Sequence, residues 1–125
     1  MIDPELQQHL SNDPNGLTTY EFMANNIGTL GEGIIWLVKN IINVDRTGQF
    51  VVSTARYLHA IDHDKYAECI DLLVKAAIVK DRERVYLRDL TASLWGPDYQ
   101  DHAAELALAS DNFRRIYKRL YPMGI

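Results

Sequence analysis

The chain has 125 residues, of which 47% are apolar and 24% are charged, and its formal net charge is -4. This length fits one domain, and this composition excludes disordered, collagen-like and low-complexity chains. The single cysteine, Cys69, excludes an internal disulfide and a Cys-rich zinc site. The sequence does not open with the basic and then apolar pattern of a secretory signal, so we expect a cytoplasmic protein.

The most apolar stretch of the chain, residues 33–44, is too short to span a membrane. It has 12 residues, whereas a spanning helix needs about 20. Lys39, Asn40 and Asn43 also interrupt it with polar groups. We therefore interpret this stretch as a buried core helix and expect no membrane contact.

Start and stop signals divide the first third of the chain into three helical segments. Asp3 and Pro4 are typical of a helix start and predict a short helix over residues 4–10. The turn-forming residues 11–16 end this helix, and a second helix is expected from about Tyr20. Three glycines predict a break between residues 26 and 33, after which the core helix runs over residues 33–43.

The later segments show the apolar spacing of three and four residues that is typical of amphipathic helices. Thr47 is expected to cap a helix over residues 49–61, and Asp62 to end that helix and cap the next, which runs to residue 80. Because the connection is short, these two helices should be antiparallel neighbours. A solvated charge cluster at residues 80–84 precedes a helix through Leu94, and two more helices are expected over residues 97–109 and 111–121.

These segments predict an all-α fold, because no stretch alternates apolar and polar residues for long enough to form a strand. We expect a compact bundle of five to seven helices that forms a single domain over residues 1–125. In this domain residues 1–16, a short helix and a turn, could be only loosely attached. A short solenoid of helical hairpins is the alternative, but the helix pairs at residues 49–80 and 83–109 share no residue pattern, and we find no internal repeat.

Charge is distributed unevenly along the chain. Residues 1–38 carry five acidic and no basic residues, whereas residues 112–125 carry four basic and no acidic residues. Opposite charges of this kind attract each other either within one molecule or head to tail between two molecules.

The last helix has the clearest binding pattern, because tyrosine and arginine are enriched at the sites that dominate protein interfaces. We therefore predict a non-enzymatic interaction module whose partner is another protein or a second copy of the same chain. The candidate partner-binding residues are Arg114, Arg115, Tyr117, Lys118, Arg119 and Tyr121.

The same helix leaves a nucleic-acid-binding regulator as an alternative function. A compact cationic face with nearby tyrosines is typical of proteins that contact phosphates and bases. Nucleic-acid-binding domains are usually basic overall, however, and this chain is acidic. A protein partner is therefore favoured.

Two histidines are the candidate metal ligands and make a metal-dependent hydrolase the second alternative. His59 and His63 are four residues apart, which on an unbroken helix places both imidazoles on one face, and Asp62 lies beside them. A helix boundary at Asp62 would destroy this geometry. We therefore keep the three residues as weak candidates and assign no metal.

No pattern points to catalysis or to a cofactor. The glycines at residues 28, 31 and 33 lack the order of a phosphate-binding loop. Cys69 lies on an apolar helix stripe, which is typical of a core residue rather than a reactive thiolate. We therefore predict no catalytic residue and no cofactor, and we favour a non-enzyme.

Overall fold

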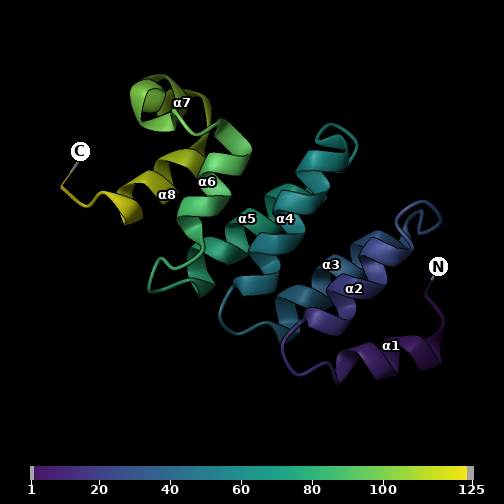
Figure 1. The fold of residues 1–125 in the computed structure, drawn as a ribbon. Helices are drawn as coiled ribbons and strands as arrows, with labels where there is room; N and C mark the ends of the chain where they lie inside the picture. Colours follow the sequence, from purple (N-terminus) through teal and green to yellow (C-terminus); the bar gives the residue numbers. More distant parts are fainter. Residues whose placement is uncertain (1, 124–125) are drawn as a thin grey trace.

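The computed structural model describes residues 2–123, which are helical apart from turns and short connections (Figure 1). In this range the chain forms eight α-helices and one 3-10 helix. Their bounds are α1 (Pro4–Ser11), α2 (Leu17–Asn25), α3 (Gly33–Val44), α4 (Gln49–Asp62), α5 (Ala67–Lys80), α6 (Leu87–Trp95), η1 (Tyr99–His102), α7 (Ala103–Ala109) and α8 (Asp111–Leu120). None of these helices combines the length and the apolar character that a membrane crossing requires.

The all-α class predicted from the sequence is confirmed, but five to seven helices was an underestimate. Ser110 separates α7 from α8, at the boundary expected between the helices over residues 97–109 and 111–121. Its backbone is extended, and its hydroxyl accepts a hydrogen bond from the amide of Phe113 at 3.1 Å. Asp111, the expected cap, is the first residue of α8 instead.

The other boundaries differ from the predicted ones by a few residues. The second helix starts at Leu17 rather than near Tyr20. α4 ends at Asp62 as predicted, but α5 starts only at Ala67, after a turn of residues 63–66. Asp62 accepts a hydrogen bond from the amide of Lys65 in that turn, at 3.1 Å. The two helices pack closely against each other, as expected from the short connection.

The helices are arranged in two layers that run along the molecule (Figure 1). α2, α4 and α6 follow one another in one layer, and α1, α3 and α5 follow one another in the second layer. α8 packs against both α5 and α6 at the C-terminal end of this row, and α7 packs on α8. The fully buried apolar side chains of α3, α4 and α5 fill the space between the layers.

A buried polar network ties the N-terminal helices to this core. The amide nitrogen of Asn40, on α3, donates to Leu10 O at 2.8 Å and to Thr19 Oγ1 at 3.0 Å. Thr19 Oγ1 in turn donates to Asp13 Oδ2 at 2.7 Å. Burying Asn40 without these partners would destabilise the fold, so the network specifies how α1 and α2 sit on α3.

Three capping loops connect the two layers and are built alike. They comprise residues 13–16, 45–48 and 81–86, and they lead from α1 to α2, from α3 to α4 and from α5 to α6. Each begins with a buried aspartate, namely Asp13, Asp45 or Asp81. In each loop the amide six residues after the aspartate donates to its carboxylate, at 2.8 or 2.9 Å. Each carboxylate therefore satisfies amides at the start of a helix that have no partner inside it.

Asp45 rather than Thr47 is consequently the main cap of α4. Asp45 Oδ2 accepts the amides of Phe50 and Val51 at 2.8 and 2.9 Å. Thr47 Oγ1 accepts only the amide of Gln49, at 3.3 Å. The predicted cap lies two residues too late because an aspartate further from the helix can reach it across the loop.

The capping loops stack directly on one another. Gly16 lies against the second loop: a Cβ placed on it would be 3.5 Å from Asp45 Cβ. Gly48 lies in the same way against the third loop, 3.4 Å from Asp81 Cβ. The three aspartates are 32 and 36 residues apart, and each unit consists of one loop and the helices that it joins. The expectation of no internal repeat is corrected by this finding, because the shared residues lie in the loops and not on the helix faces.

Candidate functional site

The third capping loop meets the last turn of α8, although the two segments are distant in sequence. Arg119 Nη1 donates to Ile78 O at 2.5 Å, and its Nη2 donates to Asp81 O at 3.2 Å. Ile78 O is one of the last carbonyls of α5, which lack partners within that helix. In return, Arg84 Nη1 donates to Arg119 O at 3.3 Å. Arg119 therefore fixes the end of α8 against the loop.

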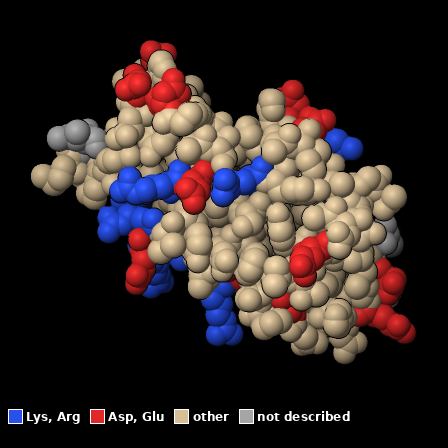
Figure 2. Space-filling model, in the orientation of Figure 1, with Lys and Arg blue, Asp and Glu red and all other residues tan. Residues whose placement is uncertain are grey.

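This contact gathers basic residues of both segments into one surface, which we call the basic surface. Its members are Arg82, Arg84, Arg88, Arg115, Lys118 and Arg119. Figure 2 shows Lys and Arg concentrated over the α6 and α8 side of the molecule, with a few acidic side chains among them, whereas most Asp and Glu lie around α1 to α3, at the end of α4 and around α7. Within residues 2–123, none of the six basic-surface residues takes part in an ion pair.

The charge count follows the same division. Residues 80–88 and 111–121 hold eight of the 13 lysines and arginines, together with three acidic residues. The rest of the chain holds five basic and fourteen acidic residues. The molecule is therefore strongly dipolar, and its positive end attracts anionic groups over a distance of about one Debye length.

The structure gives the six candidate partner-binding residues different surroundings. Arg115 and Lys118 belong to the basic surface without an ion-pair partner in residues 2–123. Arg119 belongs to it as well, but its guanidinium is engaged by backbone carbonyls of the same chain. Arg114 instead forms an exposed ion pair with Asp111 at the start of α8.

Tyr117 and Tyr121 are half-buried in an aromatic cluster between α8 and η1. Their ring centroids are 4.7 Å apart, and the Tyr121 hydroxyl is hydrogen-bonded to that of Tyr99 at 2.9 Å. Burial and this hydrogen bond raise the pKa of Tyr99 to about 12, so its hydroxyl stays neutral. The guanidinium of Arg88 lies 5.5 Å from the Tyr121 ring centroid, within cation–π range. Tyr121 therefore borders the basic surface, whereas Tyr117 mainly packs the cluster.

The basic residues of the third loop were not predicted as binding residues, because residues 80–84 were interpreted from the sequence as a solvated charge cluster. Only the contact with α8 shows that Arg82, Arg84 and Arg88 belong with the last helix. Two exposed apolar side chains are close to these cations in sequence: Val79, near the end of α5, is 62% exposed, and Val85, in the loop itself, is 60% exposed. A surface that combines unpaired cations with exposed valines is suited to a protein partner.

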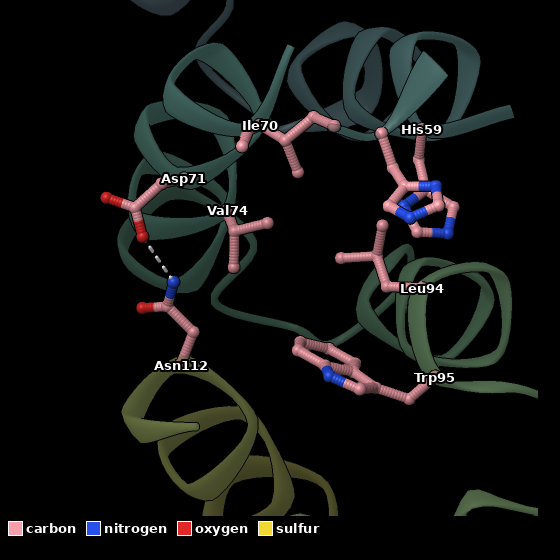
Figure 3. Close-up of a pocket in the computed structure, with 9 residues that line it drawn as sticks. His59, Ile70, Asp71, Val74, Leu94, Trp95 and Asn112 are labelled. Carbon is pink, nitrogen blue, oxygen red and sulfur yellow. Dashed lines mark hydrogen bonds between the residues drawn. The ribbon is translucent and has the colours of Figure 1, made fainter. Parts of the chain in front are cut away.

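His59 and His63 do share a helix face, and they line a hollow between α4, α5, α6 and α8 (Figure 3). α4 ends at Asp62, but His63 keeps helical backbone angles, so the two imidazole centroids are 5.1 Å apart. The hollow has a volume of about 230 Å³, and its walls are largely apolar, formed by Ile70, Val74, Leu94 and Trp95.

This geometry brings together two of the three candidate metal ligands, His59 and His63. Within residues 2–123, no group of three or more His, Cys, Asp or Glu side chains is arranged to hold a metal ion. Asp62 caps the turn after α4 instead of joining the histidines. Burial and the neighbouring His63 lower the pKa of His59, so the neutral form of the His59 imidazole is favoured.

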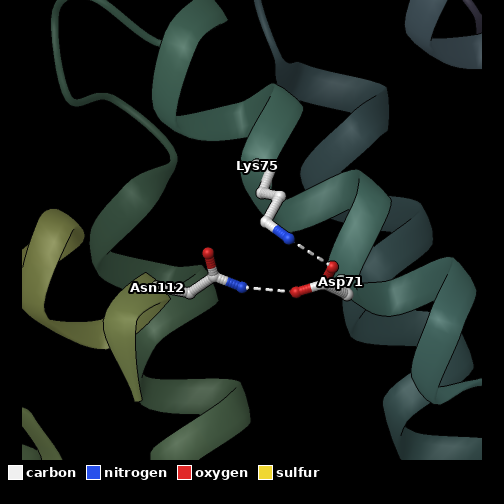
Figure 4. A network of polar contacts seen from close by, with 3 residues as sticks. All are labelled: Asp71, Lys75 and Asn112. Carbon is white, nitrogen blue, oxygen red and sulfur yellow. Dashed lines mark hydrogen bonds and ion pairs between the residues drawn. The ribbon is translucent and has the colours of Figure 1, made fainter. Parts of the chain in front are cut away.

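A polar bridge on one side of this hollow attaches the start of α8 to α5 (Figure 4). Asp71 accepts hydrogen bonds from Lys75 Nζ at 2.7 Å and from Asn112 Nδ2 at 2.8 Å. These hydrogen bonds lower the pKa of Asp71. α8 is therefore fixed to α5 at both ends, by Asn112 and by Arg119, so the basic surface is held on a firmly docked helix.

A second hollow of about 500 Å³ lies between α2, α4 and α6 and is the other candidate for partner binding. Its lining residues are Tyr20, Ser53, Arg56, Tyr57, His59, Ala60 and Ser93. Arg56 Nε donates to Ser93 Oγ at 2.7 Å, which holds the guanidinium against α6. Only one lysine or arginine lines this hollow, so it lacks the charge density of the basic surface.

Comparison with known family models, curated proteins and solved structures gives no significant match to this chain.

Proposed function

We propose that the protein is a non-enzymatic interaction module whose basic surface docks onto an acidic surface of a partner protein. The observation that carries this proposal is the gathering of six cations, none of them in an ion pair within residues 2–123, at one end of an otherwise acidic molecule. Such an arrangement accelerates association with an oppositely charged partner and orients it. The module would act in the cytoplasm, which the lone cysteine favours.

Two features support a protein partner over a nucleic acid. Val79 and Val85, which are next to the cations of the third loop in sequence, expose apolar side chains, and apolar contacts contribute to protein interfaces more than to phosphate contacts. The remainder of the chain is strongly acidic, so a long polyphosphate that extended beyond the basic surface would be repelled.

The stacked capping loops support a second part of the proposal, that the helices of this compact fold are arranged as a short helical-hairpin solenoid. In a solenoid each unit contacts only its neighbours, and the terminal unit has one face without a neighbouring unit. Here the third loop is the last of the stack and carries Arg82 and Arg84, and the last turn of α8 rather than a fourth loop lies against it.

The experiment compares two probes of equal negative charge by fluorescence anisotropy. One is a labelled, end-blocked peptide of aspartate, glycine and leucine, which we call the acidic probe, and the other is a labelled oligonucleotide. We expect the chain to bind the acidic probe more tightly, and the binding to weaken as salt is added because added ions screen the charges. Sedimentation of the chain alone, at low and high salt, measures whether a second copy supplies the acidic surface.

Matched variants test whether the basic surface is responsible for the binding. A chain with Arg82→Gln, Arg88→Gln, Arg115→Gln and Lys118→Gln should lose the binding, whereas one with Lys39→Gln, Arg46→Gln, Lys65→Gln and Arg114→Gln should keep it. Tighter binding of the oligonucleotide would replace this proposal by the nucleic-acid alternative. Absence of binding to both probes, together with a salt-independent monomer in sedimentation, would remove the proposal.

A further inference from the structure

The third capping loop departs from the other two at one backbone position. The residue three after the aspartate has a positive φ in each loop: 104° at Gly16, 93° at Gly48 and 60° at Arg84. Glycine adopts this left-handed conformation without steric conflict, whereas a side chain crowds the backbone there. Within residues 2–123, Arg84 is the only residue other than glycine with a positive φ.

The backbone angle favours glycine at the first two positions, and the stacking adds to this preference at Gly16. A Cβ on Gly16 would lie 3.1 Å from Phe50 Cβ of the next unit, which is tight, whereas a Cβ on Gly48 would lie 3.4 Å from Asp81 Cβ, at ordinary contact distance. No further capping loop follows Arg84 within residues 2–123. A side chain is therefore sterically allowed at Arg84, but the strained backbone angle is unchanged.

Within residues 2–123, the Arg84 side chain makes little stabilising contact that would offset this strain. Its one hydrogen bond, from Nη1 to Arg119 O, is 3.3 Å long and exposed to solvent. Within residues 2–123 it has no carboxylate within ion-pair distance. Strained residues that persist without an internal benefit concentrate at functional sites.

We propose that Arg84 is the anchor of the basic surface and that it receives a carboxylate from an acidic loop of the partner protein. This inference rests on the proposed function and names the residue and the chemical group through which it acts. In the stack, the left-handed glycine of each loop lies beside the Cβ of the aspartate in the next loop, Gly16 beside Asp45 and Gly48 beside Asp81, while each carboxylate caps its own helix. The partner loop takes the corresponding position on Arg84.

The chemistry of the position fits a carboxylate ligand. A guanidinium offers two parallel N–H groups that match the two oxygens of an aspartate or glutamate. Arg82 and Arg88 lie close in sequence and add positive potential, and Val85, which is 60% exposed, provides an apolar contact beside the ion pair. The occupant is therefore a protein loop with an aspartate or glutamate and an adjacent apolar side chain.

The test uses the variant Arg84→Gly, which restores the residue found in the other two loops. We expect the unfolding midpoint in urea to stay unchanged or to rise, while binding of the acidic probe weakens by about tenfold or more. Arg84→Lys keeps the charge but loses the paired N–H groups, so it should weaken binding less than the glycine variant. Arg114→Gln, which removes a cation that is already paired with Asp111, is the matched control and should bind like the unchanged chain.

The outcomes separate this inference from the proposed function. If Arg84→Gly binds the acidic probe as tightly as the unchanged chain, while the fourfold glutamine variant has lost binding, Arg84 is not the anchor and the proposed function survives. If the unchanged chain binds neither probe and stays a salt-independent monomer in sedimentation, the proposed function fails first. A strong loss of stability in Arg84→Gly would also overturn the inference, because the arginine would then be required for folding.

Discussion

The second and third capping loops perform the same structural task with different residues at the left-handed position. Gly48 sits inside the stack against Asp81, and Arg84 sits at its end, beside α8. A residue other than glycine in this conformation costs about 1–2 kcal/mol. The comparison shows that the chain avoids this cost inside the stack and accepts it at the end, where positive charge is most concentrated.

The largest expected effect tests whether the loops are equivalent as caps. Asp45→Ala leaves four amides without their acceptor, those of Thr47, Gly48, Phe50 and Val51. We expect it to lower the free energy of unfolding by about 3 kcal/mol, since lost caps and unsatisfied buried donors both contribute. Asp81→Ala should lower it by a similar amount. Urea unfolding followed by circular dichroism measures both, and Asp64→Ala, at a 92% exposed side chain, is the control.

A much smaller loss for Asp81→Ala than for Asp45→Ala would break the comparison. It would mean that the third loop is held by Arg119 and α8 rather than by its own aspartate, since Arg119 also donates to Asp81 O and Ile78 O.

A smaller effect, of opposite sign in the two loops, sharpens the comparison. Gly48→Ala places a Cβ at φ 93° and 3.4 Å from Asp81 Cβ, so it should lower the free energy of unfolding by roughly 1–2 kcal/mol. Arg84→Gly should leave it unchanged or raise it by up to about 1 kcal/mol. The same urea titration measures both variants. Equal losses in the two variants would contradict the view that Arg84 is strained.

The smallest effect concerns pH and the first loop. Burial would raise the pKa of Asp13, but hydrogen bonds from Thr19, Gly16 and Asn15 outweigh it and lower the pKa below its ordinary value of 3.8. A lowered carboxylate pKa in the folded state adds stability above the unfolded pKa, and this stability is lost as pH falls below about 4. Asp13→Asn should therefore be less stable near pH 7, and its stability should decline less than that of the unchanged chain towards about pH 3. Urea unfolding at both pH values measures the difference, and parallel declines would contradict it.

The fold was largely predictable from local signals, because each helix has its own start, stop and apolar spacing. The core helix, observed at residues 33–44 and expected at 33–43, and the end of α4 at Asp62 lie where glycine, aspartate and the apolar pattern place them. The helix caps were harder to predict, because Asp45 and Ser110 act from outside the helix and compete with the nearer candidates Thr47 and Asp111. A search for Asp followed three residues later by Gly would have found the first two capping loops, at Asp13 and Asp45.

The candidate site was only half predictable. Arg115, Lys118 and Tyr121 follow from the pattern of the last helix, but Arg82, Arg84 and Arg88 join them through a tertiary contact that local spacing does not encode. The sequence also could not show that Arg119 binds backbone carbonyls or that Arg114 is paired with Asp111. Which cations are left for a partner depends on which ones the fold itself uses.

The most direct test of the central claim is an NMR titration of the isotope-labelled chain with the acidic probe, followed through the backbone amide signals. The account predicts that the amides of residues 82–88 and 115–121 shift first and most, with Arg84 among the largest changes. Shifts concentrated on Tyr20, Tyr57 and Ser93 would place binding in the hollow between α2, α4 and α6 and would contradict the account.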